Sequence, residues 1–244
     1  MKTLHSSGTA FVYGSTSFNE VMKTMEVIKT NDRLNDSTLS IETKKSLLTI
    51  IDKFFLYISS EASKMTLFTL VNDTKSITNE LFSQNLEEYM YLTVAQNVTS
   101  SYNKGIEKVV KDFSEVLIKA QGGMIINNPE PYNLKFKLEN GKEYWIDIKT
   151  NYEQKEDDRQ IIKEKRVIAE NEGKEYRLCI YDDEHLSNSE YILNGYDFWT
   201  LIAGFDGAKE KVFKLIHGTA KNLSISSIVR ETKNKFLNKW RQEC

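Results

Sequence analysis

The sequence predicts an α/β protein in which a mainly helical N-terminal part precedes a mixed β-sheet flanked by helices. Three observations lead to this fold class. Apolar residues recur at spacings of three and four in residues 40–62 and again in 104–120, which is typical of amphipathic helices. The dipeptide Asn140-Gly141 separates two β-prone runs. An apolar run at 176–181 follows a charged helical segment, as in a strand that returns to a sheet.

The first hundred residues are predicted to be mainly helical. Residues 40–62 form one amphipathic pattern and residues 79–96 are a second candidate helix, whereas 67–71 could be a short strand or more helix. A third helix is expected over 104–120, and it should end at the paired glycines that follow, Gly122 and Gly123.

A β-hairpin is expected next. Runs 132–138 and 143–149 are separated by a segment with Asn140-Gly141, and both of these residues tolerate the positive φ of a type I′ turn. Two prolines, Pro129 and Pro131, stand immediately before the hairpin, where they stop helix and start extended chain.

Further elements complete the predicted sheet and its cover. A charged helix at about 158–172 ends at Gly173, a strand follows at 176–181, and two or three helices run from Tyr196 to the end. The sequence contains neither an internal repeat nor a linker. We therefore expect a single domain over 1–244, with 1–100 as a helical elaboration and 101–244 as the core that carries the site.

Composition narrows the class of protein. The 244 residues are 40% hydrophobic and 28% charged, which suits a folded domain, and no apolar run of 18 residues predicts a membrane span. The N-terminus lacks the apolar segment of a secretory signal, and Cys179 and Cys244 do not form a disulfide framework, so a reducing, cytoplasmic setting is expected.

Charge is uneven along the chain. The net charge is only −2, but residues 207–244 carry nine Lys or Arg against three Glu, a local balance of +6. Such a stretch could lie along phosphate, or it could be the solvated face of a lysine-rich helix.

One acid-x-lysine tripeptide stands out from five others in the sequence. Asp147-Ile148-Lys149 closes a run apolar enough to be an inner strand, and alternation puts Asp147 and Lys149 on one face of it. Buried charges are costly unless they are paired or bind a metal. A structural ion pair at a strand end is the alternative to a catalytic site.

The chain resembles the PD-(D/E)XK nuclease superfamily from about residue 103 onward. Residues 146–152 look like the metal-site strand of the restriction enzyme EcoRV, and Asn133, fourteen residues before Asp147, stands where the family places its first acidic ligand. Helix 104–120, with Glu107, resembles the helix before the site, which adds an acid in several restriction enzymes. Residues 195–199, followed by Gly204, look like a stretch that recurs in type II restriction enzymes.

This resemblance implies a restriction-endonuclease-like fold and a type II restriction endonuclease. Its expected reaction is the Mg²⁺-dependent hydrolysis of phosphodiester bonds in double-stranded DNA at a short palindrome, by a homodimer whose two-fold symmetry matches that of the site. Asp147, the Ile148 carbonyl and residue 133 would hold the metal, while Lys149 would act on the water and the phosphate. Glu107 would join the site, or it is simply an exposed residue of its helix.

The family expects Asp where this sequence has Asn133, and three explanations are open. In the first, residue 133 is an Asp in the natural protein that has been changed to Asn, which is isosteric and silences the chemistry. In the second, Glu130 serves as the first acidic ligand in place of residue 133. In the third, the protein is a nuclease relic that binds DNA without cutting it. We favour the first. A structure-specific repair nuclease and a catalytically dead DNA-binding module remain the alternative functions. Base contacts are expected outside the motif, in the helical N-terminal part or in 182–195.

Overall fold

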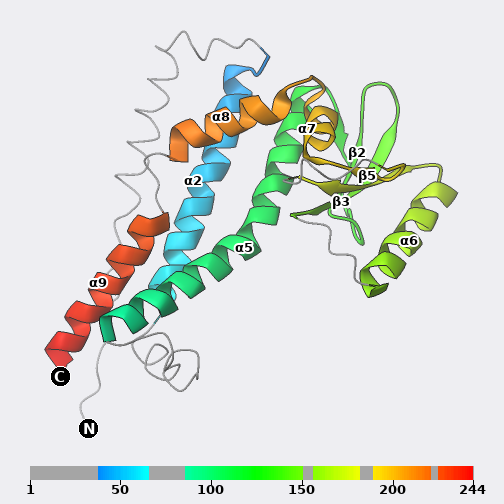
Figure 1. Ribbon diagram of the computed structural model, residues 1–244. Helices are drawn as coiled ribbons and strands as arrows, with labels where there is room; N and C mark the ends of the chain where they lie inside the picture. Colours follow the sequence, from blue (N-terminus) through cyan, green and yellow to red (C-terminus); the bar gives the residue numbers. More distant parts are fainter. Residues whose placement is uncertain (1–37, 66–85, 151–155, 182–188, 221–224, 244) are drawn as a thin grey trace.

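The computed structural model describes residues 38–65, 86–150, 156–181, 189–220 and 225–243. These residues form six helices and one five-stranded mixed sheet, so the predicted α/β class and the mainly helical N-terminal part are confirmed (Figure 1). Predictions for 67–71 and for 182–188, the first half of 182–195, lie outside the described residues.

Helix α2 (Ile41–Lys64) is the predicted first helix, found within two residues of its expected bounds. The side chain of Ser40 caps its N-terminus by accepting a hydrogen bond from the Thr43 N–H at 3.1 Å. The apolar stripe is buried against α5 and includes Leu47 and Ile58, which are fully enclosed.

Helix α5 (Leu86–Ala120) is one helix where the sequence predicts two, over 79–96 and 104–120. Its 35 residues extend about 50 Å at 1.5 Å per residue. Gly105 lies within this helix and does not interrupt it. The ring of Phe54 in α2 lies only 2.7 Å from where a Cβ at 105 would be. The glycine thus serves the close contact of two helices. The expected boundary between residues 100 and 101 falls inside α5.

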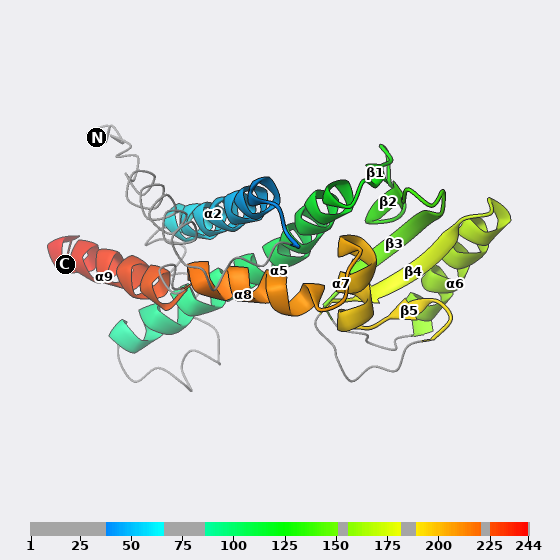
Figure 2. The same ribbon diagram turned by 90° about the horizontal axis from the view of Figure 1, so that it is seen from above.

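Helix α5 joins the two parts of the molecule. Its N-terminal half packs with α2 and α9 (Ile225–Glu243), and its C-terminal half contacts the sheet and α7 (Gly195–Ala203). Helix α8 (Ala208–Ala220) packs against both α7 and α2. Seen from above, the helical part lies at one end and the sheet at the other (Figure 2). None of the described helices has the length and apolar character that a membrane span requires.

The sheet has the order β1-β2-β3-β4-β5. Strands β1 (Met124–Ile125), β2 (Leu134–Lys137) and β3 (Glu143–Lys149) are antiparallel neighbours, whereas β4 (Glu175–Ile180) and β5 (Ile192–Leu193) continue the sheet in parallel. Helix α6 (Glu156–Asn171) lies between β3 and β4 in the chain, as a parallel connection requires. Strands β1 and β5 were not predicted, because two residues are too few to form a pattern.

The predicted β2–β3 hairpin is confirmed, but its expected turn type was wrong. Gly141 has a φ of +85°, and Asn140 is not among the described residues with positive φ. The Gly141 N–H donates to the Leu138 carbonyl at 3.0 Å, and the Leu138 N–H donates to the Lys142 carbonyl at 2.9 Å. These bonds define a three-residue loop that ends in a left-handed glycine, so only one residue needs positive φ.

The two faces of β3 are buried in different clusters. Ile146 and Ile148 belong to the large core shared with α5 and α7, whereas Trp145 packs with Ile162 of α6 and Tyr176 of β4. Strand alternation places Asp147 on the face opposite Ile146 and Ile148, as the sequence predicts, and α6 covers this face.

Candidate functional site

A pocket of about 970 Å³ opens beside β3 and gathers the residues singled out in the sequence. Glu107 comes from α5, Asn133 precedes β2, and Asp147, Ile148 and Lys149 end β3; all five line this pocket. Three segments that are distant in the chain thus meet at one place. Further charged groups at the pocket wall are Lys111, Glu130 and Lys165.

Asp147 lines the pocket and is buried, with 6% of its surface exposed. The Lys165 ammonium of α6 lies 2.9 Å from each of its two carboxylate oxygens. The Tyr176 hydroxyl donates to Oδ2 at 3.0 Å, and the Asn133 backbone N–H donates to Oδ1 at 3.3 Å. A buried carboxylate needs such donors, because its lost hydration must be replaced.

Two tyrosines hold this arrangement in place. Burial and the nearby Asp147 carboxylate strongly raise the pKa of Tyr176, so its hydroxyl stays protonated and remains a donor to Asp147. Burial, followed by the same carboxylate, also raises the pKa of Tyr132. The Tyr132 hydroxyl donates to the Lys165 carbonyl at 2.8 Å, and the Lys165 ammonium lies 5.5 Å from the Tyr132 ring centroid. Tyr132 therefore fixes α6 to the segment before β2.

Asn133 is exposed at the pocket and bonded to β3 through both backbone and side chain. Its N–H also donates to the Ile146 carbonyl at 3.0 Å, and its Oδ1 accepts the Ile148 N–H at 2.8 Å. An aspartate at this position could accept the same N–H with one oxygen and keep the second. The hydrogen bonds at position 133 thus suit both Asn and Asp, and the two side chains differ there only in their charge.

The lining charges balance formally, with three acids against three lysines. The acids are Glu107, Glu130 and Asp147, and the lysines are Lys111, Lys149 and Lys165. Glu107 is exposed on α5, and Lys111 follows it by one helical turn on the same side. Lys149 is half-buried at the end of β3.

As the sequence stands, the donor set does not fit Mg²⁺. Magnesium sites usually need one or two carboxylates that are available to the ion. Here the Asp147 carboxylate already binds an ammonium, and the Asn133 amide oxygen accepts a backbone N–H. Across the described segments, no group of three or more His, Cys, Asp or Glu side chains could hold a metal ion.

Sequence reasoning missed Lys165, Tyr176 and Lys111. A signal for Lys165 existed, because it follows Ile162 by three residues and precedes Ala169 by four, and both are buried. A lysine on the apolar face of an amphipathic helix should point inward. Of the cations weighed after β3, Arg159 and Lys163 are exposed and absent from the pocket lining, and Lys155 lies outside the described residues.

The other acid-x-lysine tripeptides stand in different settings. Glu42 and Glu231 begin such tripeptides on helices α2 and α9, and Glu172 begins one in the turn before β4. The remaining two, which start at Asp73 and Glu153, lie outside the described residues. Within the described part, Asp147 alone begins such a tripeptide on a strand.

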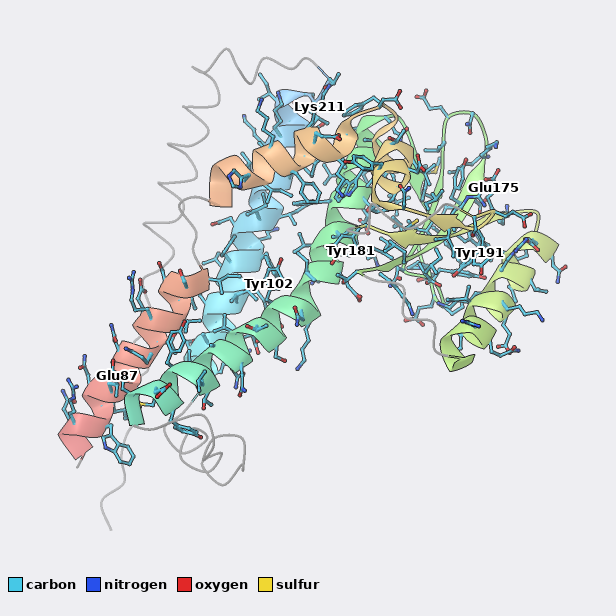
Figure 3. All side chains as sticks on the ribbon, in the orientation of Figure 1. Glu87, Tyr102, Glu175, Tyr181, Tyr191 and Lys211 are labelled. Carbon is cyan, nitrogen blue, oxygen red and sulfur yellow. The ribbon has the colours of Figure 1, made fainter. Side chains whose placement is uncertain are left out.

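Part of the basic C-terminal stretch contributes to the fold itself. Lys209 is buried, and the Lys211 ammonium lies 2.9 Å from the Thr38 hydroxyl oxygen. Lys233 forms an ion pair with Glu87 of α5 at 2.6 Å; Glu87 and Lys211 are labelled in Figure 3. For these three of the nine basic residues, the contacts favour a structural use over a phosphate-binding one.

No protein-family model matches the chain, and no curated protein matches it in sequence.

Proposed function

We propose that the protein is a DNA-processing nuclease of the PD-(D/E)XK type, with its site in the pocket beside β3. The observation that carries this proposal is the meeting of Asp147, Lys149 and Asn133 with Glu107 of α5 in one pocket. The sequence singled out these four residues from three separate segments. A structural ion pair at a strand end would not require Asn133 and Glu107 to be present as well.

The arrangement of elements supports the same proposal. Helix α5 comes before the hairpin, α6 follows β3, and β4 returns parallel to β3, which agrees with a restriction-endonuclease-like mixed sheet flanked by helices. Fold alone does not assign activity, so the weight rests on the side chains of the pocket.

The chemistry that this pocket offers depends on residue 133. Lys111 and Lys149 present ammonium groups that can bind a phosphodiester oxygen. The neutral Asn133 supplies no carboxylate at its position next to Asp147, although Glu107 and Glu130 line the same pocket, so the present sequence favours binding of DNA over its cleavage. Asp at 133 would add that carboxylate, and Mg²⁺-dependent hydrolysis is proposed for that form.

The specific function proposed is a type II restriction endonuclease that acts as a homodimer on a short palindrome in double-stranded DNA. The supporting likeness is that of residues 146–152 to the metal-site strand of EcoRV and of 195–199 to a stretch in type II enzymes. The alternatives are a structure-specific repair nuclease with the same core and a DNA-binding module without activity.

Digestion by the Asn133→Asp variant tests this function. We expect discrete fragments from plasmid DNA with MgCl₂, and no fragments from an Asn133→Asp/Asp147→Asn control. Preference for a four-way junction over the linear duplex would instead favour a repair nuclease. If the variant leaves every substrate intact, the catalytic proposal fails and only DNA binding remains to be tested.

A further inference from the structure

The donors around Asp147 fill its capacity to accept hydrogen bonds. A carboxylate has about four lone-pair directions on its two oxygens. Lys165 uses one on each oxygen, Tyr176 uses another on Oδ2, and the Asn133 N–H uses another on Oδ1. A cation that binds Asp147 must therefore displace one of these donors.

Lys165 is the donor that can be displaced. Tyr176 belongs to a strand and is 2% exposed, and the Asn133 donor is a backbone N–H that also bonds to the Ile146 carbonyl. Lys165 has a long flexible side chain, 19% of which is exposed, and it lines the open pocket. It also carries the positive charge that a metal ion would otherwise supply to Asp147.

We propose that Lys165 is an internal counter-ion that occupies the cation position at Asp147, so that its ion pair and a divalent metal ion exclude each other. The proposal rests on the proposed function only in naming a divalent metal as the competitor. It explains why the site does not fit Mg²⁺ even though its carboxylate is well formed. In the unchanged sequence Lys165 thus competes with a metal ion for Asp147, and an Asp at 133 would add a second carboxylate that favours the metal ion.

The alternative is that the ion pair only holds α6 against the sheet. Tyr132 already joins the same two elements through its hydrogen bond to the Lys165 carbonyl, which a side-chain substitution leaves in place. Loss of the ammonium in Lys165→Met leaves a buried carboxylate without a counter-ion. A divalent cation should then be bound by Asp147 if the two compete, and should have no effect if the ion pair is purely structural.

Terbium luminescence provides the test, because Trp145 lies two residues from Asp147 and can sensitise a bound Tb³⁺ ion. We expect Lys165→Met to bind Tb³⁺ at least tenfold more tightly than the unchanged chain, with the signal reversed by MgCl₂. The matched control, Asp147→Asn/Lys165→Met, lacks both charges and should lose the gain. Equal affinity of Lys165→Met and the unchanged chain, or an equal gain in the control, overturns the proposal.

Melting temperature with and without MnCl₂ covers the case in which Lys165→Met folds poorly. Mn²⁺ should raise the melting temperature of Lys165→Met by several degrees more than that of the double variant. If Lys165→Met stays unfolded at every MnCl₂ concentration while the double variant folds, the ion pair is structural and the proposal is wrong. Neither measurement uses DNA, so failure here is distinct from failure of the nuclease proposal.

Discussion

At the scale of single residues, the buried Asp147 carboxylate needs hydrogen-bond donors, and these come from several elements. A carboxylate with 6% of its surface exposed requires partners from several elements, and it receives them from α6, from β4 and from the segment before β2. Asp147 and Lys149 were predicted from a tripeptide on an apolar strand, and Asn133 and Glu107 from the resemblance to the PD-(D/E)XK nucleases. Lys165 and Tyr176 were missed because their contact with Asp147 depends on the packing of α6 and β4.

Tyr176→Phe isolates the hydroxyl that donates to Asp147. The change keeps the ring but removes one donor from a buried carboxylate, and we expect a loss of about 1–3 kcal/mol in the free energy of unfolding. Urea denaturation of both proteins measures it. Tyr191→Phe is a suitable control, because Tyr191 (Figure 3) packs on the same cluster and is less buried. Equal losses in the two variants would mean that the Asp147 contact contributes nothing specific.

At the scale of elements, the sequence predicted the helix and the hairpin that carry clear patterns, but it did not predict that α5 is one continuous helix. Helix α2 was predicted because its apolar residues recur at spacings of three and four. The β2–β3 hairpin was predicted because Asn140-Gly141 separates two β-prone runs. Helix α5 was divided wrongly into 79–96 and 104–120. Gly105 lies inside the second of these ranges, and in the structure it makes room for a ring from α2. Propensity cannot anticipate a contact with another helix.

Gly105→Ala tests the close contact of α2 and α5. Alanine favours a helix over glycine by about 1 kcal/mol, but its Cβ would lie 2.7 Å from a ring carbon of Phe54. We expect crowding to dominate, with a net loss of about 1–3 kcal/mol as in other overpacked cores. The exposed Ser100→Ala on the same helix should change stability much less. A net gain in stability from Gly105→Ala would show that the helices separate at little cost.

At the scale of the whole molecule, α5 connects the helical part to the candidate site. Its N-terminal half packs with α2 and α9, while Glu107 and Lys111 in its C-terminal half line the pocket beside β3. Tyr102 (Figure 3) lies between these regions, with its ring centroid 5.5 Å from that of Phe54 in α2. The helical part therefore sets the position of one wall of the pocket. The sequence could not predict this link while it divided α5 in two.

Binding of DNA at the pocket beside β3, as proposed above, can be tested on the unchanged sequence. The measurement is the affinity for a short labelled duplex, by fluorescence anisotropy over a range of salt concentrations, of the chain and of Lys111→Met/Lys149→Met. The control is Lys45→Met/Lys53→Met, which removes the same charge from exposed positions on α2. We predict at least a tenfold weaker affinity for the pocket variant and a salt slope reduced by about two, since each lost phosphate contact lowers it by about 0.9. Unchanged binding by the pocket variant, or an equal loss in the control, would contradict the account.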